Sequence, residues 1–153
     1  MPGTDTHEAC AGRVALVTGA ARGIGQTIAF GLAKRGAAVI IGGIEDLTET
    51  GELIARTGKA AFAAALDISD PSSVDEVRKR VADEPGRVDI LVSNAAIFES
   101  TTWDELDLEL DPELWQRVMS ANLNGPMLMC KAFLPLMRGR GCGRVLTWPR
   151  RQS

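Results

Sequence analysis

Short apolar runs alternate with amphipathic stretches from residue 14 to residue 147. The apolar runs predict five strands, at residues 14–17, 39–41, 60–66, 90–92 and 144–147. The amphipathic stretches predict helices at residues 24–35, 46–56, 71–84 and 112–137. Gly36 fits the C-terminal end of the first helix, and Pro71 after Asp70 fits the first turn of the third. The strands are continuous apolar runs, so we expect them to be buried on both faces.

This alternation of strands and helices is typical of a parallel sheet covered by helices on both sides. Right-handed crossovers are the rule in such sheets. We therefore predict an α/β fold, a doubly wound parallel sheet of the Rossmann type, over residues 12–147, with five strands in the order 3-2-1-4-5. Residues 1–11 are expected to form a flexible tail.

A glycine-rich turn follows the first predicted strand and opens the first predicted helix, with the sequence Thr18-Gly19-Ala20-Ala21-Arg22-Gly23-Ile24-Gly25. Glycine lets the backbone turn tightly and come close to a pyrophosphate. The helix N-terminus adds free N–H groups and a partial positive charge. Because the strand and the helix supply the context that this motif needs, we predict a dinucleotide site. The alternative is a turn that only packs the helix onto the strand.

The chain resembles the short-chain dehydrogenases/reductases, whose T-G-x-x-x-G-I-G signature it matches in full. Three further segments carry the resemblance: Leu66-Asp67-Ile68, Ser93-Asn94-Ala95-Ala96 and the helical segment from Trp115 to Gly125. Ser93 and Ala96 depart from the N-N-A-G pattern of the family. The resemblance implies an oxidoreductase that moves a hydride between a nicotinamide cofactor and a small-molecule alcohol or carbonyl.

The resemblance also implies which residues form the site for NAD or NADP. Asp67 stands where the family contacts adenine; the alternative is that it only caps the next turn. Asn94 stands where the family ties the central strands together; the alternative is a local Asx-turn. Asn122 matches the catalytic asparagine, and a polar residue in mid-helix supports a site there. The expected cofactor contacts are Gly19, Ala21, Arg22, Gly23, Ile24, Gly25, Glu45, Asp67, Ile68, Asn94, Ala95 and Ala96.

The end of the second predicted strand bears on the choice between NAD and NADP. An acidic side chain there binds the ribose 2′-OH of NAD, whereas a basic one suits the 2′-phosphate of NADP. Gly43 stands where NAD-preferring members carry aspartate, and Glu45 lies near the spacing expected for an acidic substitute. Arg22 in the glycine turn would suit the phosphate instead, so the sequence leaves the choice open.

The chain contains no tyrosine. In the family, a tyrosine beside the lysine of a Y-x-x-x-K helix transfers the proton, and a serine orients the substrate. A phenol with a pKa of about 10 is a poor base at neutral pH without a neighbouring cation. The resemblance therefore implies that the 153-residue chain is an incomplete copy of a short-chain NAD(P)-dependent oxidoreductase, which retains only Asn122 of the catalytic set and is expected to be inactive. The alternatives are a non-catalytic NAD(P)-binding module and a non-functional remnant.

Residues 148–153 do not continue the family pattern. Codons for Thr147 to Gln152, with CGN codons for the two arginines, can be read from the third base of the threonine codon. This shifted reading gives leucine, methionine or valine, then alanine, and then three residues drawn from serine, proline, threonine and alanine, as the family has there. We hypothesise an out-of-frame tail and the loss of the family's C-terminal strands and helices. A divergent terminus or a cut chain is the alternative.

Charge and composition narrow the classes of partner and site that the chain can have. A formal net charge of -3 gives no basic excess for nucleic acid, and no apolar run reaches the roughly 18 residues that span a bilayer. The first residues lack the apolar core of a signal peptide. Three cysteines and one histidine, widely spaced, predict no disulfide framework and no metal site. We expect a cytoplasmic protein, and homo-oligomers for the full-length parent of this chain.

Overall fold

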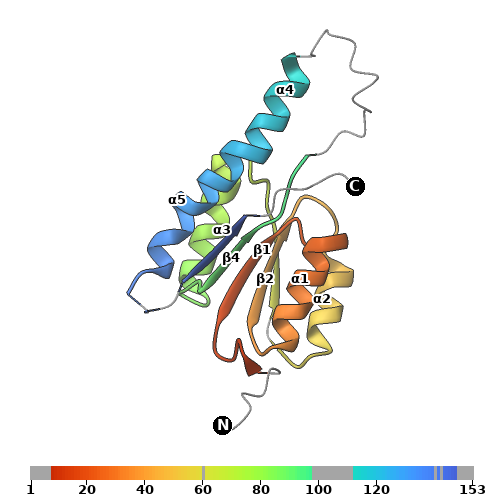
Figure 1. Cartoon of the computed structure of the whole chain (residues 1–153), viewed down its shortest axis with the longest axis vertical. Coiled ribbons are helices and arrows are strands. Elements are labelled where there is room, and N and C mark those ends of the chain that lie inside the picture. The colour runs from red at the N-terminus through yellow and green to blue at the C-terminus, as the bar shows by residue number, and fades with distance from the viewer. Residues whose placement is uncertain (1–7, 60, 98–111, 140, 142, 148–153) are drawn as a thin grey trace.

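The computed structural model describes residues 8–59, 61–97, 112–139, 141 and 143–147 (Figure 1). One parallel sheet runs through it, in the strand order β3-β2-β1-β4-β5, which confirms the predicted order. Its strands are β1 (Val14–Thr18), β2 (Ala38–Gly43), β3 (Ala61–Ala65), β4 (Ile90–Ser93) and β5 (Arg144–Thr147).

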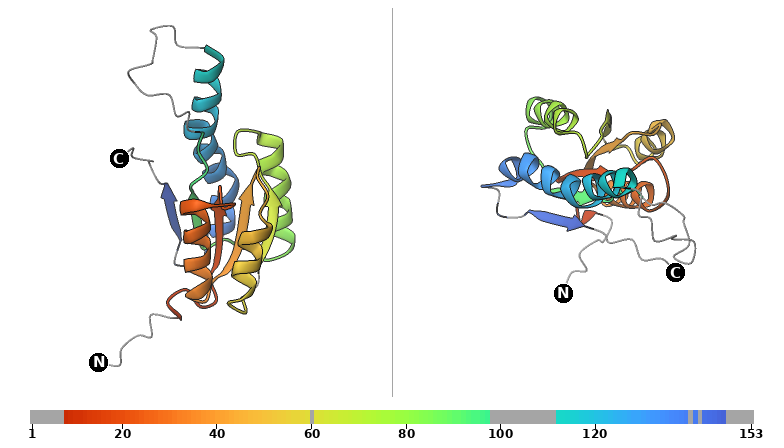
Figure 2. Two further views of the ribbon diagram at one scale, coloured as in Figure 1. Left: turned by 90° about the vertical axis from the view of Figure 1, so that its right-hand side faces the viewer. Right: turned by 90° about the horizontal axis from the view of Figure 1, so that it is seen from above.

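Helices cover both faces of the sheet (Figure 2). On one face, α1 (Gly23–Lys34) and α2 (Thr48–Ala55) pack on β1, β2 and β4. On the other face, α3 (Pro71–Asp83) and α5 (Gly125–Met137) pack on the same strands. Successive strand residues serve opposite layers: Leu16 packs with α3 and α5, whereas Val17 packs with α1 and α2. This double burial explains why β1, β2 and β4 read as unbroken apolar runs. The expected burial on both faces is wrong for β5, because this strand lies at the edge of the sheet and all four of its residues are exposed.

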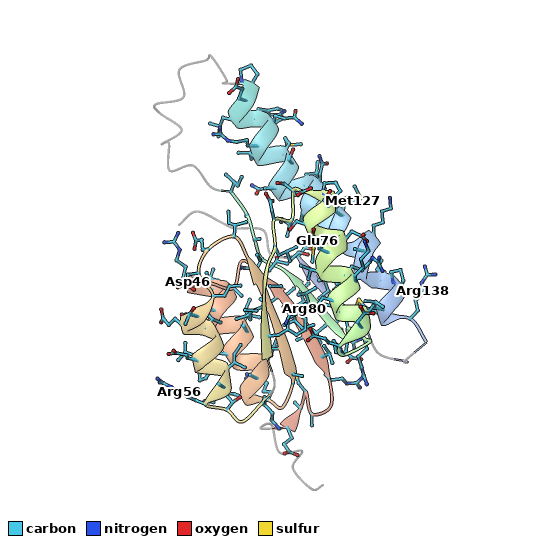
Figure 3. All side chains as sticks on the ribbon, turned by 180° about the vertical axis from the view of Figure 1, so that it is seen from behind. Asp46, Arg56, Glu76, Arg80, Met127 and Arg138 are labelled. Carbon is cyan, nitrogen blue, oxygen red and sulfur yellow. The ribbon has the colours of Figure 1, made fainter. Side chains whose placement is uncertain are left out.

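The helix ends follow local hydrogen-bonding rules. The Asp70 side chain accepts from Ser72 N at 2.9 Å, which caps α3 just before Pro71. α2 begins at Thr48 rather than at Asp46 because the Asp46 carboxylate accepts from Thr48 N and Oγ1. These hydrogen bonds lower the pKa of Asp46 below its usual value. Asp46 and Arg56 mark the two ends of α2 in Figure 3.

The single helix predicted over residues 112–137 is wrong in its middle. α4 (Pro112–Met119) is followed by a π-helical turn, Ser120–Asn124, and only then by α5. A π turn holds one residue more than an α turn, too small a change for hydrophobic periodicity to reveal. α4 extends beyond the end of the sheet and buries none of its residues (Figure 1).

A buried carboxylate joins β1 to β4 at the edge of the sheet where these strands begin. Asp89 Oδ2 accepts from Val14 N at 2.8 Å, and Arg87 donates to both carboxylate oxygens. Burial raises the pKa of Asp89, but Arg87, the Val14 N–H and Arg13 together outweigh that effect, so the pKa lies below its usual value. The carboxylate is therefore ionised in the folded protein at neutral pH.

Residues 8–11 form a turn that Cys10 N ties to Arg35 O at 2.8 Å. The rest of the predicted N-terminal tail, residues 1–7, and the hypothesised out-of-frame tail, residues 148–153, lie outside the described residues. Within the part of the chain that is described, no helix has the length and apolarity that a membrane span requires.

Candidate functional site

A cavity of about 270 Å³ opens at the C-terminal edge of the sheet, where β1, β2, β3 and β4 end. Ligands of open parallel sheets bind at this edge, where the strand order reverses. The cavity is lined by every predicted cofactor residue except Gly23, namely Gly19, Ala21, Arg22, Ile24, Gly25, Glu45, Asp67, Ile68, Asn94, Ala95 and Ala96. Folding thus gathers four separate sequence segments into one site.

Several lining residues were not predicted: Gly43, Ile44, Leu66, Ser69, Ile97 and Ala121. Most of them adjoin residues that the motifs did single out, so a wider window around each motif would have included them. Gly23 has a φ of 61°, which an L side chain rarely adopts. Gly23 does not line the cavity, and its positive φ forms the turn itself.

The glycine turn packs directly against the loop that follows β4. Gly19 has a φ of 62°, and a Cβ there would lie 2.7 Å from Ala95 Cα. A Cβ on Gly25 would collide with the Gly19 carbonyl oxygen. Glycine at these two positions is thus required by the backbone contacts that form the floor of the cavity.

Asn94 ties the ends of β1 and β4 together. Its Nδ2 donates to Thr18 O at 3.1 Å and to Gly19 O at 3.0 Å, and its backbone N donates to Thr18 Oγ1. The fully buried Thr18 hydroxyl in turn donates to Val92 O. The Asn94 side chain therefore spans two strands, and the Asx-turn alternative does not describe its contacts.

The N-terminus of α1 is left without a capping side chain. Arg22 occupies the N-cap position with no side-chain cap, and the first turn contains no acidic residue. By contrast, Asp70 caps α3. The first N–H groups of a helix carry a partial positive charge and need acceptors. With Ile24 and Gly25 lining the cavity, this helix end offers donors to an anion there.

Arg22 and Glu45 meet across one end of the cavity. Arg22 Nη2 donates to Glu45 Oε1 at 2.9 Å, and the side chains are 82% and 49% exposed. The sequence offered these two residues as rival determinants of the cofactor, but the structure pairs them. The positive charge of Arg22 is therefore balanced inside the site.

Asp67 lies two residues beyond the end of β3, and its carboxylate already accepts hydrogen bonds. Its Oδ1 accepts from Ser69 N at 2.9 Å and from Ser69 Oγ at 2.6 Å, which makes a local turn. Asp67 and Ile68 both line the cavity. The turn fixes the direction of the side chain at the cavity wall, while its contact with adenine stays a prediction.

Asn122 lies in the π-helical turn and does not line the cavity directly. Its Nδ2 donates to Ile97 O and its Oδ1 accepts from Ile97 N, both at 2.8 Å. These bonds hold the loop after β4 against the long helix, and Ile97 is a lining residue. π turns are frequent at functional sites. The predicted catalytic role of Asn122 stays a prediction.

Comparisons with known proteins agree with this geometry. A family model described as short chain dehydrogenase matches residues 13–148. Galactitol 2-dehydrogenase of Agrobacterium fabrum is 44% identical over 131 residues, which are 86% of this chain and 49% of the relative. The 3-oxoacyl-[acyl-carrier-protein] reductase of Escherichia coli is 36% identical over 138 residues, 89% of this chain and 54% of the relative.

Solved structures show the same fold. L-sorbose reductase from Gluconobacter frateurii, complexed with NADPH and L-sorbose, has a TM-score of 0.83 at 30% identity, covering 92% of this chain and 53% of that one. Carveol dehydrogenase from Mycobacterium avium, in complex with NAD, has a TM-score of 0.81 at 29% identity, covering 93% and 55%. The chain spans about half the length of the relatives that it matches. Because the family model matches nearly the whole length of the chain, the chain belongs to the short-chain dehydrogenase family.

Proposed function

We propose that the 153-residue chain binds NAD or NADP in the cavity at the C-terminal edge of its sheet. The pyrophosphate lies at the uncapped N-terminus of α1, the adenine end lies beside Asp67 and Ile68, and the nicotinamide end extends toward Ala95 and Ala96. The observation that carries this proposal is the uncapped helix end, which opens into a cavity lined by the glycine turn.

We further propose that this chain binds the dinucleotide without transferring a hydride. The chain has no tyrosine, and the family's proton transfer needs one beside a lysine. A polypeptide that adds those residues to this domain would act on a small-molecule alcohol or carbonyl. The names of two relatives, a galactitol dehydrogenase and a sorbose reductase, support that substrate class.

The Arg22–Glu45 pair favours NAD over NADP. A 2′-phosphate adds a charge of about -1.5 to -2, by analogy with other phosphomonoesters, and would have to displace Glu45 from Arg22. A ribose 2′-OH can donate to the free lone pairs of the Glu45 carboxylate without breaking the pair. NAD is therefore the preferred dinucleotide in this proposal.

The test is a charge placed at the uncapped helix end. Ile24 is 43% exposed in the first turn of α1 and lines the cavity. Ile24→Glu brings a carboxylate toward the two charges of the pyrophosphate. At a separation of about 5 Å in water, this repulsion lowers the affinity at least about tenfold. An acidic residue in the first helical turn does not weaken the helix itself, so folding is preserved.

Ile24→Gln is the matched control, because it has the shape of Glu without the charge. Isothermal titration calorimetry with NAD should show weak binding for Ile24→Glu and near-normal binding for Ile24→Gln. Equal affinities for both variants would contradict the placement of the pyrophosphate. Gly19→Asp is less useful, because its side chain would collide with the Ala95 backbone and disturb the fold.

A further inference from the structure

Thr50, in the first turns of α2, makes unusual contacts for a helical threonine. The side chain is fully buried, and its hydroxyl donates to Ala20 O at 2.8 Å, with Ala21 O at 3.1 Å as a second acceptor. It accepts from Gln26 Nε2 at 3.0 Å, and that same amide reaches Ala21 O at 3.3 Å. One buried hydroxyl of α2 thus meets two carbonyl groups of the glycine turn.

These contacts determine which way the peptide groups of the turn face. In a planar trans peptide, the C=O of one residue and the N–H of the next point in opposite directions. Because the Ala20 and Ala21 carbonyls face Thr50, the N–H groups of Ala21 and Arg22 point away from it. Ala21 and Arg22 both line the cavity. The Thr50 hydroxyl therefore sets the direction of two donors at the site.

Two further contacts attach the glycine turn to the β2 side of the site. Ala20 N donates to Gly42 O at 3.3 Å, and Arg22 pairs with Glu45. On the β4 side, Asn94 holds Gly19 O. Thr50 is the one fully buried side chain among these β2-side contacts, so solvent cannot replace its hydroxyl.

We propose that Thr50 is a positioning residue for the pyrophosphate, an inference that rests on the proposed dinucleotide binding. Its hydroxyl holds the Ala20 and Ala21 carbonyls toward α2, so that the N–H groups of Ala21 and Arg22 are oriented before the cofactor arrives. A donor that is already oriented loses less freedom on binding, which increases affinity. Gln26 completes the arrangement by donating to Thr50 and to Ala21 O.

A positioning role and a purely structural role of Thr50 predict different effects on the affinities of different ligands. A loss of packing would weaken every ligand of the cavity alike. A loss of donor orientation weakens ligands that contain a pyrophosphate, such as NAD and ADP, and spares adenosine. The comparison of these probes therefore separates positioning from general damage.

The variants follow from the hydroxyl. Thr50→Val keeps the shape of the side chain and removes the hydroxyl, whereas Thr50→Ser restores it. Thr57→Val is the matched control, because the Thr57 hydroxyl bonds only Ile54 O at the far end of α2, among the contacts described. NAD and ADP binding is measured by calorimetry on the 153-residue chain, and adenosine binding by ligand-detected NMR.

We expect Thr50→Val to weaken NAD and ADP about tenfold, equivalent to about 1.4 kcal/mol. Adenosine binding should stay within twofold, and Thr50→Ser and Thr57→Val should bind NAD like the parent chain. Wild-type affinity in Thr50→Val, or an equal loss for adenosine, overturns the proposal. If Thr50→Val does not fold, Gln26→Met must show the same selective loss in smaller degree. A parent chain that binds neither NAD nor ADP refutes the proposed function itself.

Discussion

The buried carboxylate of Asp89 gives a quantitative test of how the sheet is held together. Asp89→Asn keeps the size of the side chain and one acceptor for Val14 N, but it removes the negative charge that Arg87 contacts at 2.6 and 2.9 Å. Arg13 Nη1, at 3.7 Å, loses the same partner. The side chain of Asp89 is 2% exposed, so water cannot take the place of the missing charge at that position.

The expected cost comes from the burial of each partner. Removing one member of a fully buried ion pair costs about 3–5 kcal/mol. Here Arg87 and Arg13 are 27% and 36% exposed, and they can turn toward solvent once Asp89 is neutral. We therefore expect Asp89→Asn to lower the free energy of unfolding by about 2–3 kcal/mol. For a chain of this size, that corresponds to a fall in Tm of about 5–10 °C.

The pH dependence has a definite sign. The pKa of Asp89 is lower in the folded chain than in the unfolded chain, where an aspartate has a pKa of about 3.9. The stabilisation is therefore fully present above about pH 4 and is lost as the pH falls through the folded pKa. The difference in unfolding free energy between parent and Asp89→Asn should be constant from about pH 5 to pH 8 and shrink at lower pH.

Urea denaturation at several pH values measures this difference. Asp75→Asn is the matched control, because Asp75 also contacts two cations, Arg78 and Lys79, yet its side chain is 46% exposed. Exposed ion pairs contribute little, so this variant should unfold at the parent's midpoint. NAD affinity should not change in Asp89→Asn, since Asp89 lies at the edge of the sheet opposite the cavity. A loss below about 0.5 kcal/mol at pH 7, or one unchanged at pH 2, would refute the reasoning.

Two further predictions concern the site. Glu45→Gln leaves Arg22 without its charged partner and removes the charge that repels a 2′-phosphate. The ratio of NADP to NAD affinity should therefore rise at least about tenfold in calorimetric titrations. An unchanged ratio would mean that the Arg22–Glu45 pair does not determine the choice of cofactor. Asn122→Ala removes both hydrogen bonds to Ile97, so amide hydrogen exchange at Ile97 should become faster, whereas Asn124→Ala, at an exposed position in the same π turn, should leave it slow.

The sequence sufficed for much of this protein because the relevant signals are local. Unbroken apolar runs located the strands, and Asp70 with Pro71 located the start of α3. The glycine turn between a strand and a helix identified the end of the sheet at which the cavity lies. These patterns record burial and backbone conformation within a few residues, which the amino acids themselves restrict.

Only the tertiary structure decided how polar groups pair across the site. Arg22 and Glu45 are separated by 23 positions, Thr50 and Ala20 by 30, and Asn122 and Ile97 by 25. No local pattern encodes such pairs, because each depends on how two elements pack after the chain has folded. The π turn that carries Asn122 also escaped prediction, because one additional residue per turn barely alters helical periodicity. The sequence alone thus determined at which end of the sheet the cavity lies, and packing determined which polar side chains pair around it.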